Sequence, residues 1–227
     1  TRSAHTPSIR RIRSQRLLET HQLSFHFAAG TPLLADISLR LAPGEWLGIS
    51  GDSGSGKSTL GKLLSGQLTP SQGSVQVDGS PLPTRGLRPV QWLPQSPELA
   101  VNPRWRVGKI LREAWTPPDT LMAAFGIEDE WLKRFPSALS GGELQRVCVL
   151  RALAPGVRYV VADEISTMLD PITQLSLWQA LKAHAEHHQL GVIVISHDTA
   201  LLNRLCHQQW HLAGGSLRIS STALKAP

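Results

Sequence analysis

The most constraining feature of the sequence is a glycine-rich segment between an apolar run and a helical pattern. Residues 51–59 read Gly-Asp-Ser-Gly-Ser-Gly-Lys-Ser-Thr and fit the pattern G-x-x-x-x-G-K-[ST]. The apolar run at 46–50 predicts a buried strand in front of it. A strand, a glycine-rich turn and a helix in this order predict an α/β fold with a phosphate-binding loop. The helical spacing after the loop is carried by Leu60, Leu63, Leu64 and Leu68.

Each part of this loop has a chemical reason to bind a triphosphate. Glycines let successive backbone N–H groups converge on phosphate oxygens, and a helix that starts at Ser58 adds the positive end of its dipole. The Lys57 ammonium can reach the outer phosphates, and the Ser58 hydroxyl can ligate Mg²⁺. We therefore predict a nucleoside triphosphate site with Mg²⁺, formed by Gly51, Asp52, Ser53, Gly54, Ser55, Gly56, Lys57, Ser58 and Thr59.

Helical and strand patterns alternate in the second half of the chain. The runs at 159–162 and 192–195 are continuously apolar, as in strands that are covered on both faces. This alternation predicts a mostly parallel sheet. The helical patterns occupy residues 143–153, 172–188 and 199–206.

Two other regions have a different character. Residues 17–49 alternate with a period of two, which predicts antiparallel strands. The alternating residues include Ile37, Leu39 and Leu41. Residues 96–150 begin with short helical segments broken by proline pairs and tryptophans, which predicts an inserted helical subdomain. Three of these tryptophans are expected to cover a docking groove on the insert: Trp105, Trp115 and Trp131.

Composition narrows the class of protein. Of the 227 residues, 41% are hydrophobic and 18% charged, so the chain can bury a large core. The net charge of +6 permits an anionic partner without selecting one. Cys148 and Cys206 are the only cysteines, which excludes a disulfide scaffold or a four-cysteine metal cluster and favours an intracellular domain. Residues 1–16 form a basic arm that we expect to be a solvated tail.

Two further motifs follow apolar strands. Asp163 and Glu164 end one predicted strand, and Ser196-His197-Asp198 ends the next. Because the carboxyl ends of parallel strands face the ligand crevice, these side chains should lie beside the phosphate loop. There Asp163 is placed to hold Mg²⁺ and Glu164 to orient an attacking water.

A third motif, Leu-Ser-Gly-Gly-Glu-Leu-Gln-Arg at 139–146, precedes a helix. Its serine and glycines form a second anion site at a helix start. Two phosphate sites for one nucleotide make sense when each nucleotide lies between two chains. Three histidines on a later helix are instead expected to lie on a solvated face, namely His184, His187 and His188.

Together these motifs resemble the ATP-binding subunit of an ATP-binding-cassette (ABC) transporter, from about residue 17 to 215. The phosphate loop resembles the Walker A motif, 139–146 the signature, and Val-Val-Ala-Asp-Glu the Walker B motif. The resemblance implies a P-loop NTPase cassette at 17–227 with a RecA-like, mostly parallel core sheet, an N-terminal antiparallel β subdomain and a short helical insert. Gln95 matches the family's Q-loop, Asp170 its D-loop and His197 its H-switch.

The resemblance also implies an ATPase with ATP and Mg²⁺ as its ligands. Glu164 would be the general base, His197 the γ-phosphate contact, and Gln95 a Mg²⁺ ligand that senses the membrane subunit. Phe27 would stack on adenine, with Phe25 as second choice. In a head-to-tail pair of cassettes, Asp170 would link the two sites, and the partner's nucleotide would meet Ser140, Gly141 and Gly142. The implied metal ligands are Ser58, Gln95 and Asp163.

The residues after Gln95 are similar to the peptide and nickel importer branch of the family. Asn102-Pro103 and a helix start follow Gln95, and Ile165 replaces the usual proline after Glu164. The implied function is uptake of nickel, a metal–metallophore complex or peptides. An exporter cassette is disfavoured. A soluble ABC ATPase acting on nucleic acid or ribosomes is the alternative.

The implied partners follow from that branch. We expect two transmembrane permeases, a second cassette that is a paralogue rather than a copy, and indirectly an extracytoplasmic solute-binding protein. No nucleic acid is expected. The chain would lie peripherally on the cytoplasmic face of the cell membrane.

Overall fold

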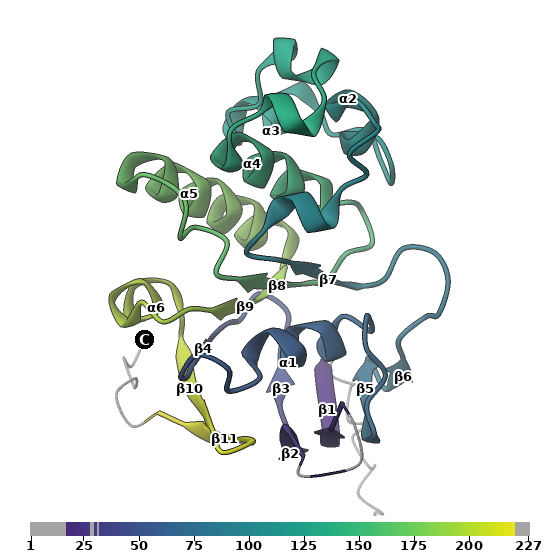
Figure 1. Cartoon of the computed structure of the whole chain (residues 1–227), viewed down its shortest axis with the longest axis vertical. Helices are drawn as coiled ribbons and strands as arrows, with labels where there is room; N and C mark the ends of the chain where they lie inside the picture. Colours follow the sequence, from purple (N-terminus) through teal and green to yellow (C-terminus); the bar gives the residue numbers. More distant parts are fainter. Residues whose placement is uncertain (1–16, 28–29, 31, 221–227) are drawn as a thin grey trace, which may run out of the picture.

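The computed structural model describes residues 17–27, 30 and 32–220. The basic arm predicted at 1–16 lies outside this range. Two sheets form the lower part of the molecule and a group of short helices forms the upper part (Figure 1). None of the helices in the described part is long and apolar enough to cross a membrane.

The first sheet is antiparallel, as the alternating pattern predicts. Its central strand, β1 (Leu18–Phe25), pairs with β2 (Leu34–Ile37), β3 (Arg40–Leu41) and β5 (Gln72–Val77), and β5 pairs with β6 (Ser80–Pro81). The alternating side chains point into the core, since each of them is at most 2% exposed: Ile37, Leu39 and Leu41.

The second sheet is the predicted parallel one. Its strand order is β11-β10-β4-β9-β8-β7, and only β11 (Ser216–Ile219) runs antiparallel to its neighbour. The parallel strands are β4 (Trp46–Ser50), β7 (Val90–Leu93), β8 (Tyr159–Asp163), β9 (Gly191–Ile195) and β10 (Gln208–Ala213).

Two hydrophobic clusters lie on opposite faces of this second sheet. Val160 and Ala162 of β8 pack into one cluster, and Tyr159 and Val161 of the same strand pack into the other. Since successive side chains of a strand point to opposite faces, both faces of β8 are covered. This explains why the strand is continuously apolar.

Helix α1 (Lys57–Leu64) follows β4 and buries Leu60, Leu63 and Leu64. The expectation that Leu68 continues this helical face is wrong. The helix ends at Leu64, and Gly66 has a φ of +71°, a left-handed conformation that turns the chain away.

The remaining long helices pack around the sheet. They are α4 (Gly141–Arg151), α5 (Pro171–His188) and α6 (Thr199–Leu205). The short helices of the predicted insert are α2 (Val107–Leu111), α3 (Asp119–Ala124) and the 3₁₀ helices η1 (Pro97–Ala100), η2 (Asp129–Lys133) and η3 (Pro136–Ala138). Of these, α2 and α3 lie above α4 (Figure 1).

Trp131 is buried inside this helical group with only 1% of its surface exposed. Its ring packs in the same cluster as Phe125 and Ile110, and the Arg146 guanidinium lies 4.8 Å from its centroid. The expectation that Trp131 covers a docking groove is therefore wrong. It is a core residue of the insert.

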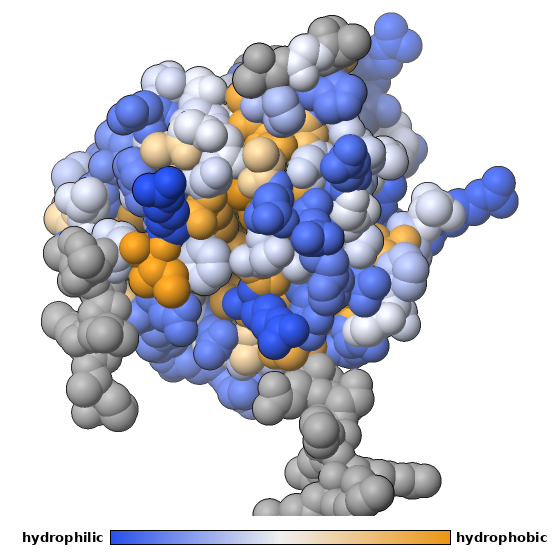
Figure 2. Space-filling model, turned by 90° about the horizontal axis from the view of Figure 1, so that it is seen from below, coloured by the Kyte–Doolittle hydropathy of each residue, from blue (hydrophilic) through white to orange (hydrophobic). Residues whose placement is uncertain are grey.

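The face seen from below shows hydrophobic patches interspersed with hydrophilic side chains (Figure 2).

The three histidines of α5 are predicted from the sequence to lie on a solvated face. His187 and His188 are exposed, but His184 is partly buried, so the expectation is wrong for His184.

Candidate nucleotide-binding site

Four parallel strands bring the predicted motifs to one edge of the second sheet. β4 ends at the phosphate loop, β7 leads to Gln95, β8 ends at Asp163 and β9 leads to His197. A cavity of about 600 Å³ opens at this edge. Its lining residues are Phe27, Leu33, Gly51, Ser53, Gly54, Gly56, Lys57, Ser58, Thr59, Gln95, Asp163, Glu164 and His197.

The loop requires glycine at its first position. Gly51 has a φ of +152°, and a Cβ there would lie 2.4 Å from the carbonyl oxygen of Leu212. The Lys57 ammonium folds back over the loop and donates to the carbonyl oxygens of Gly51 (2.7 Å) and Asp52 (2.8 Å). Helix α1 begins at Lys57, one residue before the expected start. Of the nine predicted loop residues, Asp52 and Ser55 do not line the cavity.

Asp163 is the most buried carboxylate of the site, with 3% of its surface exposed. Burial raises its pKa, while hydrogen bonds from Ser58 and Trp92 oppose that shift. The Trp92 indole N–H donates to Asp163 Oδ2 at 3.3 Å. Mg²⁺ prefers oxygen ligands with few protein donors, so the Asp163 carboxylate and the Ser58 hydroxyl fit this ion.

Glu164 and His197 are in direct contact. The Glu164 Oε1 atom accepts from the backbone N–H of His197 at 3.0 Å and lies 2.9 Å from its ring Nδ1. Glu164 Oε2 lies 3.5 Å from the Ser196 hydroxyl, which donates to it. The Glu164 side chain is only 13% exposed, whereas that of His197 is 73% exposed. The Glu164 carboxylate is thus held by the His197 backbone N–H and the Ser196 hydroxyl, while the His197 imidazole is mostly exposed.

Gln95 is linked to the backbone of Glu164, not to its carboxylate, through a residue that sequence reasoning missed. The Gln95 amide donates to the Thr167 hydroxyl at 3.4 Å, and that hydroxyl donates to the carbonyl oxygen of Glu164 at 3.0 Å. Thr167 and Trp92 belong to no motif, so only the folded structure identifies their contacts.

Phe27 is 75% exposed at the edge of the cavity, and Phe25 is 8% exposed beneath it. Their ring centroids lie 4.9 Å apart with planes nearly perpendicular, at 87°. Of the two aromatic candidates, Phe27 alone lines the cavity.

The remaining predicted residues lie outside this cavity. Ser140 caps α4 and forms a capping box with Glu143: each side chain accepts from the other residue's backbone N–H, at 3.3 and 2.6 Å. The next two residues, Gly141 and Gly142, open the helix. Asp170 caps α5 by accepting from the N–H groups of Ile172 and Thr173. Hydrogen bonding, chiefly with Thr173, lowers the pKa of Asp170.

Known proteins are similar to this chain in sequence and in fold. Residues 34–167 match the family model described as ABC transporter. The nickel import ATP-binding protein NikE of Rhodospirillum rubrum is 35% identical over 195 residues, which span 78% of this chain and 70% of that protein. NikE of Escherichia coli K12 is 32% identical over 228 residues, spanning 88% and 85%.

Two solved structures have the same fold. One is described as the ATP-binding subunit of an ABC transporter, with a TM-score of 0.77, 24% identity and 88% of both chains covered. The other is cbiO1 from Clostridium perfringens, part of the ABC transporter complex cbiONQ, with a TM-score of 0.73, 21% identity and coverage of 89% and 87%. The expected cassette fold is confirmed. The chain belongs to the ABC transporter family and is an ABC ATPase.

Proposed function

We propose that this chain is the ATP-hydrolysing subunit of an importer for nickel, a metal–metallophore complex or peptides. The observation that carries the catalytic part is the contact of Glu164 with His197 at the mouth of the phosphate-loop cavity. Among the three cargoes, nickel has the strongest support, because the NikE relatives are named for nickel import.

Different residues of this chain bind the phosphates, the adenine and the Mg²⁺ of the nucleotide. The loop amides and Lys57 bind the phosphates, and Phe27 offers its exposed ring to adenine. Ser58, Asp163 and Gln95 supply the oxygen ligands for Mg²⁺. When bound, Mg²⁺ neutralises charge on the phosphate oxygens. The Lys57 contacts with Gly51 and Asp52 must open so that its ammonium can turn to the phosphates.

Glu164 accepts the proton of the attacking water, and its position allows this role. Its carboxylate is held by the backbone N–H of His197, so it keeps one orientation whether or not the imidazole moves. The His197 ring is mostly exposed on the cavity side and can donate to the γ-phosphate. A fixed acceptor and a nearby donor are what hydrolysis of a phosphoanhydride requires.

A second cassette completes the site. Ser140, Gly141 and Gly142 do not line the cavity of their own chain, and a Cβ placed at Gly141 would meet nothing within 4 Å. We assign these residues to the nucleotide of a partner cassette, for which we favour a paralogue. Asp170, which caps α5, would then mediate contact between the two sites.

The other partners are two permeases and, indirectly, an extracytoplasmic solute-binding protein. The chain would bind peripherally to the cytoplasmic face of the membrane through these permeases. The relatives support this arrangement because they are named as ATP-binding proteins of import systems.

The test is purification of the chain with a streptavidin-binding tag from detergent-solubilised native membranes, followed by mass spectrometry. The proposal predicts two polytopic permeases in the eluate, and predicts that deleting the gene lowers ⁶³Ni²⁺ uptake until wild-type protein is restored. Peptide uptake assayed in the same strains separates the two cargoes. Recovery of ribosomal or DNA-repair proteins without any membrane protein would overturn the importer assignment.

A further inference from the structure

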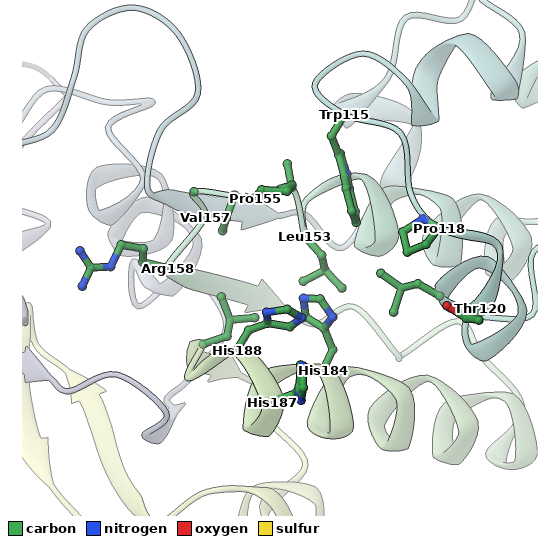
Figure 3. Close-up of a pocket in the computed structure, with 14 residues that line it drawn as sticks. Trp115, Pro118, Thr120, Leu153, Pro155, Val157, Arg158, His184, His187 and His188 are labelled. Atoms are coloured by element: carbon green, nitrogen blue, oxygen red, sulfur yellow. The ribbon is translucent and has the colours of Figure 1, made fainter.

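A second cavity, of about 650 Å³, lies away from the nucleotide site and shares no lining residue with it. Its walls come from three parts of the chain (Figure 3). They are the last turns of α5, the segment 153–158 after α4, and residues 115–121, which lead into α3. The cavity therefore lies between the helical insert and the sheet-containing core.

Three histidines of α5 line this cavity, and two of them, His184 and His188, have a spacing suited to chelation. His184 and His188 are four residues apart on one helix, so they share a face. Their ring centroids lie 4.3 Å apart, with planes tilted by 38°. The rings of His184 and His188 lie side by side in Figure 3. The His187 ring also lines the cavity, and its centroid lies 4.8 Å from that of His188 with the two planes nearly perpendicular, at 85°. Two histidines at i and i+4 can bind one metal ion from the same helix face.

The rest of the cavity selects against hard cations. Its walls are largely apolar, and no carboxylate is among its lining residues in the described part of the chain. Arg158 also lines it, but its guanidinium pairs with Asp78 and lies on the far side from the imidazoles in Figure 3. Mg²⁺ and Ca²⁺ need oxygen donors, whereas imidazole suits Ni²⁺, Cu²⁺ and Zn²⁺.

One more polar group belongs to the cavity. The Trp115 indole lies opposite the histidines in Figure 3, and its buried Nε1 atom donates to none of the described residues. A cation held by two imidazoles keeps water in its other positions, and such a water can accept from an indole N–H.

We propose that His184 and His188 form a surface-accessible site for one divalent transition-metal ion of the Ni²⁺, Cu²⁺ and Zn²⁺ class. No group of three or more His, Cys, Asp or Glu residues in the described part of the chain is arranged as a metal site. The site thus has two protein ligands, and the ion exchanges readily. The inference uses no part of the nucleotide site and does not depend on the transported cargo.

The test is calorimetric titration of the purified chain with NiCl₂ and with ZnCl₂, after complete removal of any polyhistidine tag. One saturable site per chain is expected, and a large excess of MgCl₂ should not displace the ion. The fluorescence of Trp115 should be quenched by Ni²⁺, measured as the difference between wild type and Trp115→Phe.

Three variants make the test specific. His184→Ala and His188→Ala should each lose the saturable site, while His187→Ala, on the same turn, should keep it. Unchanged binding in either of the first two variants, or equal loss in all three, would overturn the proposal. Since His184 is partly buried, circular dichroism and ATP binding check that its variant folds, and the exposed His188 provides the test that folding does not confound.

Discussion

The carboxylate of Glu164 contacts His197 at two points, because one oxygen accepts from the backbone N–H and also faces the ring Nδ1. The contact is set by the parallel pairing of β8 and β9, in which Asp163 lies opposite Ile195. Residues that follow these two strands are therefore neighbours. Glu164 also has a φ of +53°, unusual for a residue with a side chain, and such strain often lies at functional sites.

Replacing His197 by Ala should separate catalysis from binding. The imidazole donor to the γ-phosphate is lost, but the backbone N–H still holds Glu164. We expect kcat for ATP to fall on the order of 100-fold with little change in ATP affinity. Phosphate release and equilibrium ATP binding measure the two quantities. His187→Ala is the control, and an equal loss of affinity and kcat would contradict this role.

Replacing Asp163 by Asn should stabilise the nucleotide-free chain at neutral pH. Burial raises the pKa of Asp163, so the ionised form is favoured more in the unfolded chain than in the folded one. Ionising the buried Asp163 carboxyl therefore lowers the unfolding free energy. This loss is absent at low pH, where the carboxyl is protonated in both states, and is complete once the pH has risen through the folded-state pKa. Urea unfolding should show a higher midpoint at about pH 7 for Asp163→Asn, together with loss of Mg²⁺-dependent hydrolysis. A lower midpoint would contradict the argument.

Replacing Gly61 by Ala should destabilise the fold through Trp92. A Cβ at Gly61 would lie 2.9 Å from Trp92 Cδ1 and 3.2 Å from Val161 Cγ1. Overpacking of this kind costs about 1–3 kcal/mol of unfolding free energy, although alanine is the better helix former by about 1 kcal/mol.

A double variant checks the cause. Gly61→Ala combined with Trp92→Leu should lose less stability in urea than the sum of the single variants, because the smaller side chain relieves the crowding. Strict additivity would show that the two residues do not interact.

His184 should make stability depend on pH. Burial, then the neighbouring His188 and His187, lowers the pKa of His184 to about 4, against about 6.5 in an unfolded chain. Between these values the unfolded state binds a proton that the folded state does not. The contribution of His184 to the unfolding free energy is therefore full above about pH 6.5 and is lost as the pH falls towards 4.

The check is the unfolding free energy of wild type and His184→Gln, measured with a chelator present from about pH 7 to about pH 4.5. The difference between the two proteins should change in favour of His184→Gln as the pH falls. Parallel curves would contradict the lowered pKa.

The sequence predicts those parts of the fold and of the site whose residues lie close to one another along the chain. The strand, loop and helix around Gly51 and Lys57 follow one another directly, and the strand ends at Asp163 and His197 share an edge because the strands are parallel. The contacts of Trp92 and Thr167 join residues about 70 positions apart, so no local pattern indicates them. The prediction for Leu68 fails because a turn at Gly66 ends the helical periodicity. The prediction for Trp131 fails because its ring packs inside the insert, and no local pattern indicates that packing.

The most direct test of the account is the turnover of Glu164→Gln, with ATP binding measured on the same preparation. The amide keeps the shape of the side chain but cannot take a proton from water. The account predicts that ATP still binds while phosphate release falls by about 100-fold to 10,000-fold. Turnover at the wild-type rate in Glu164→Gln would contradict the assignment of Glu164 as the base.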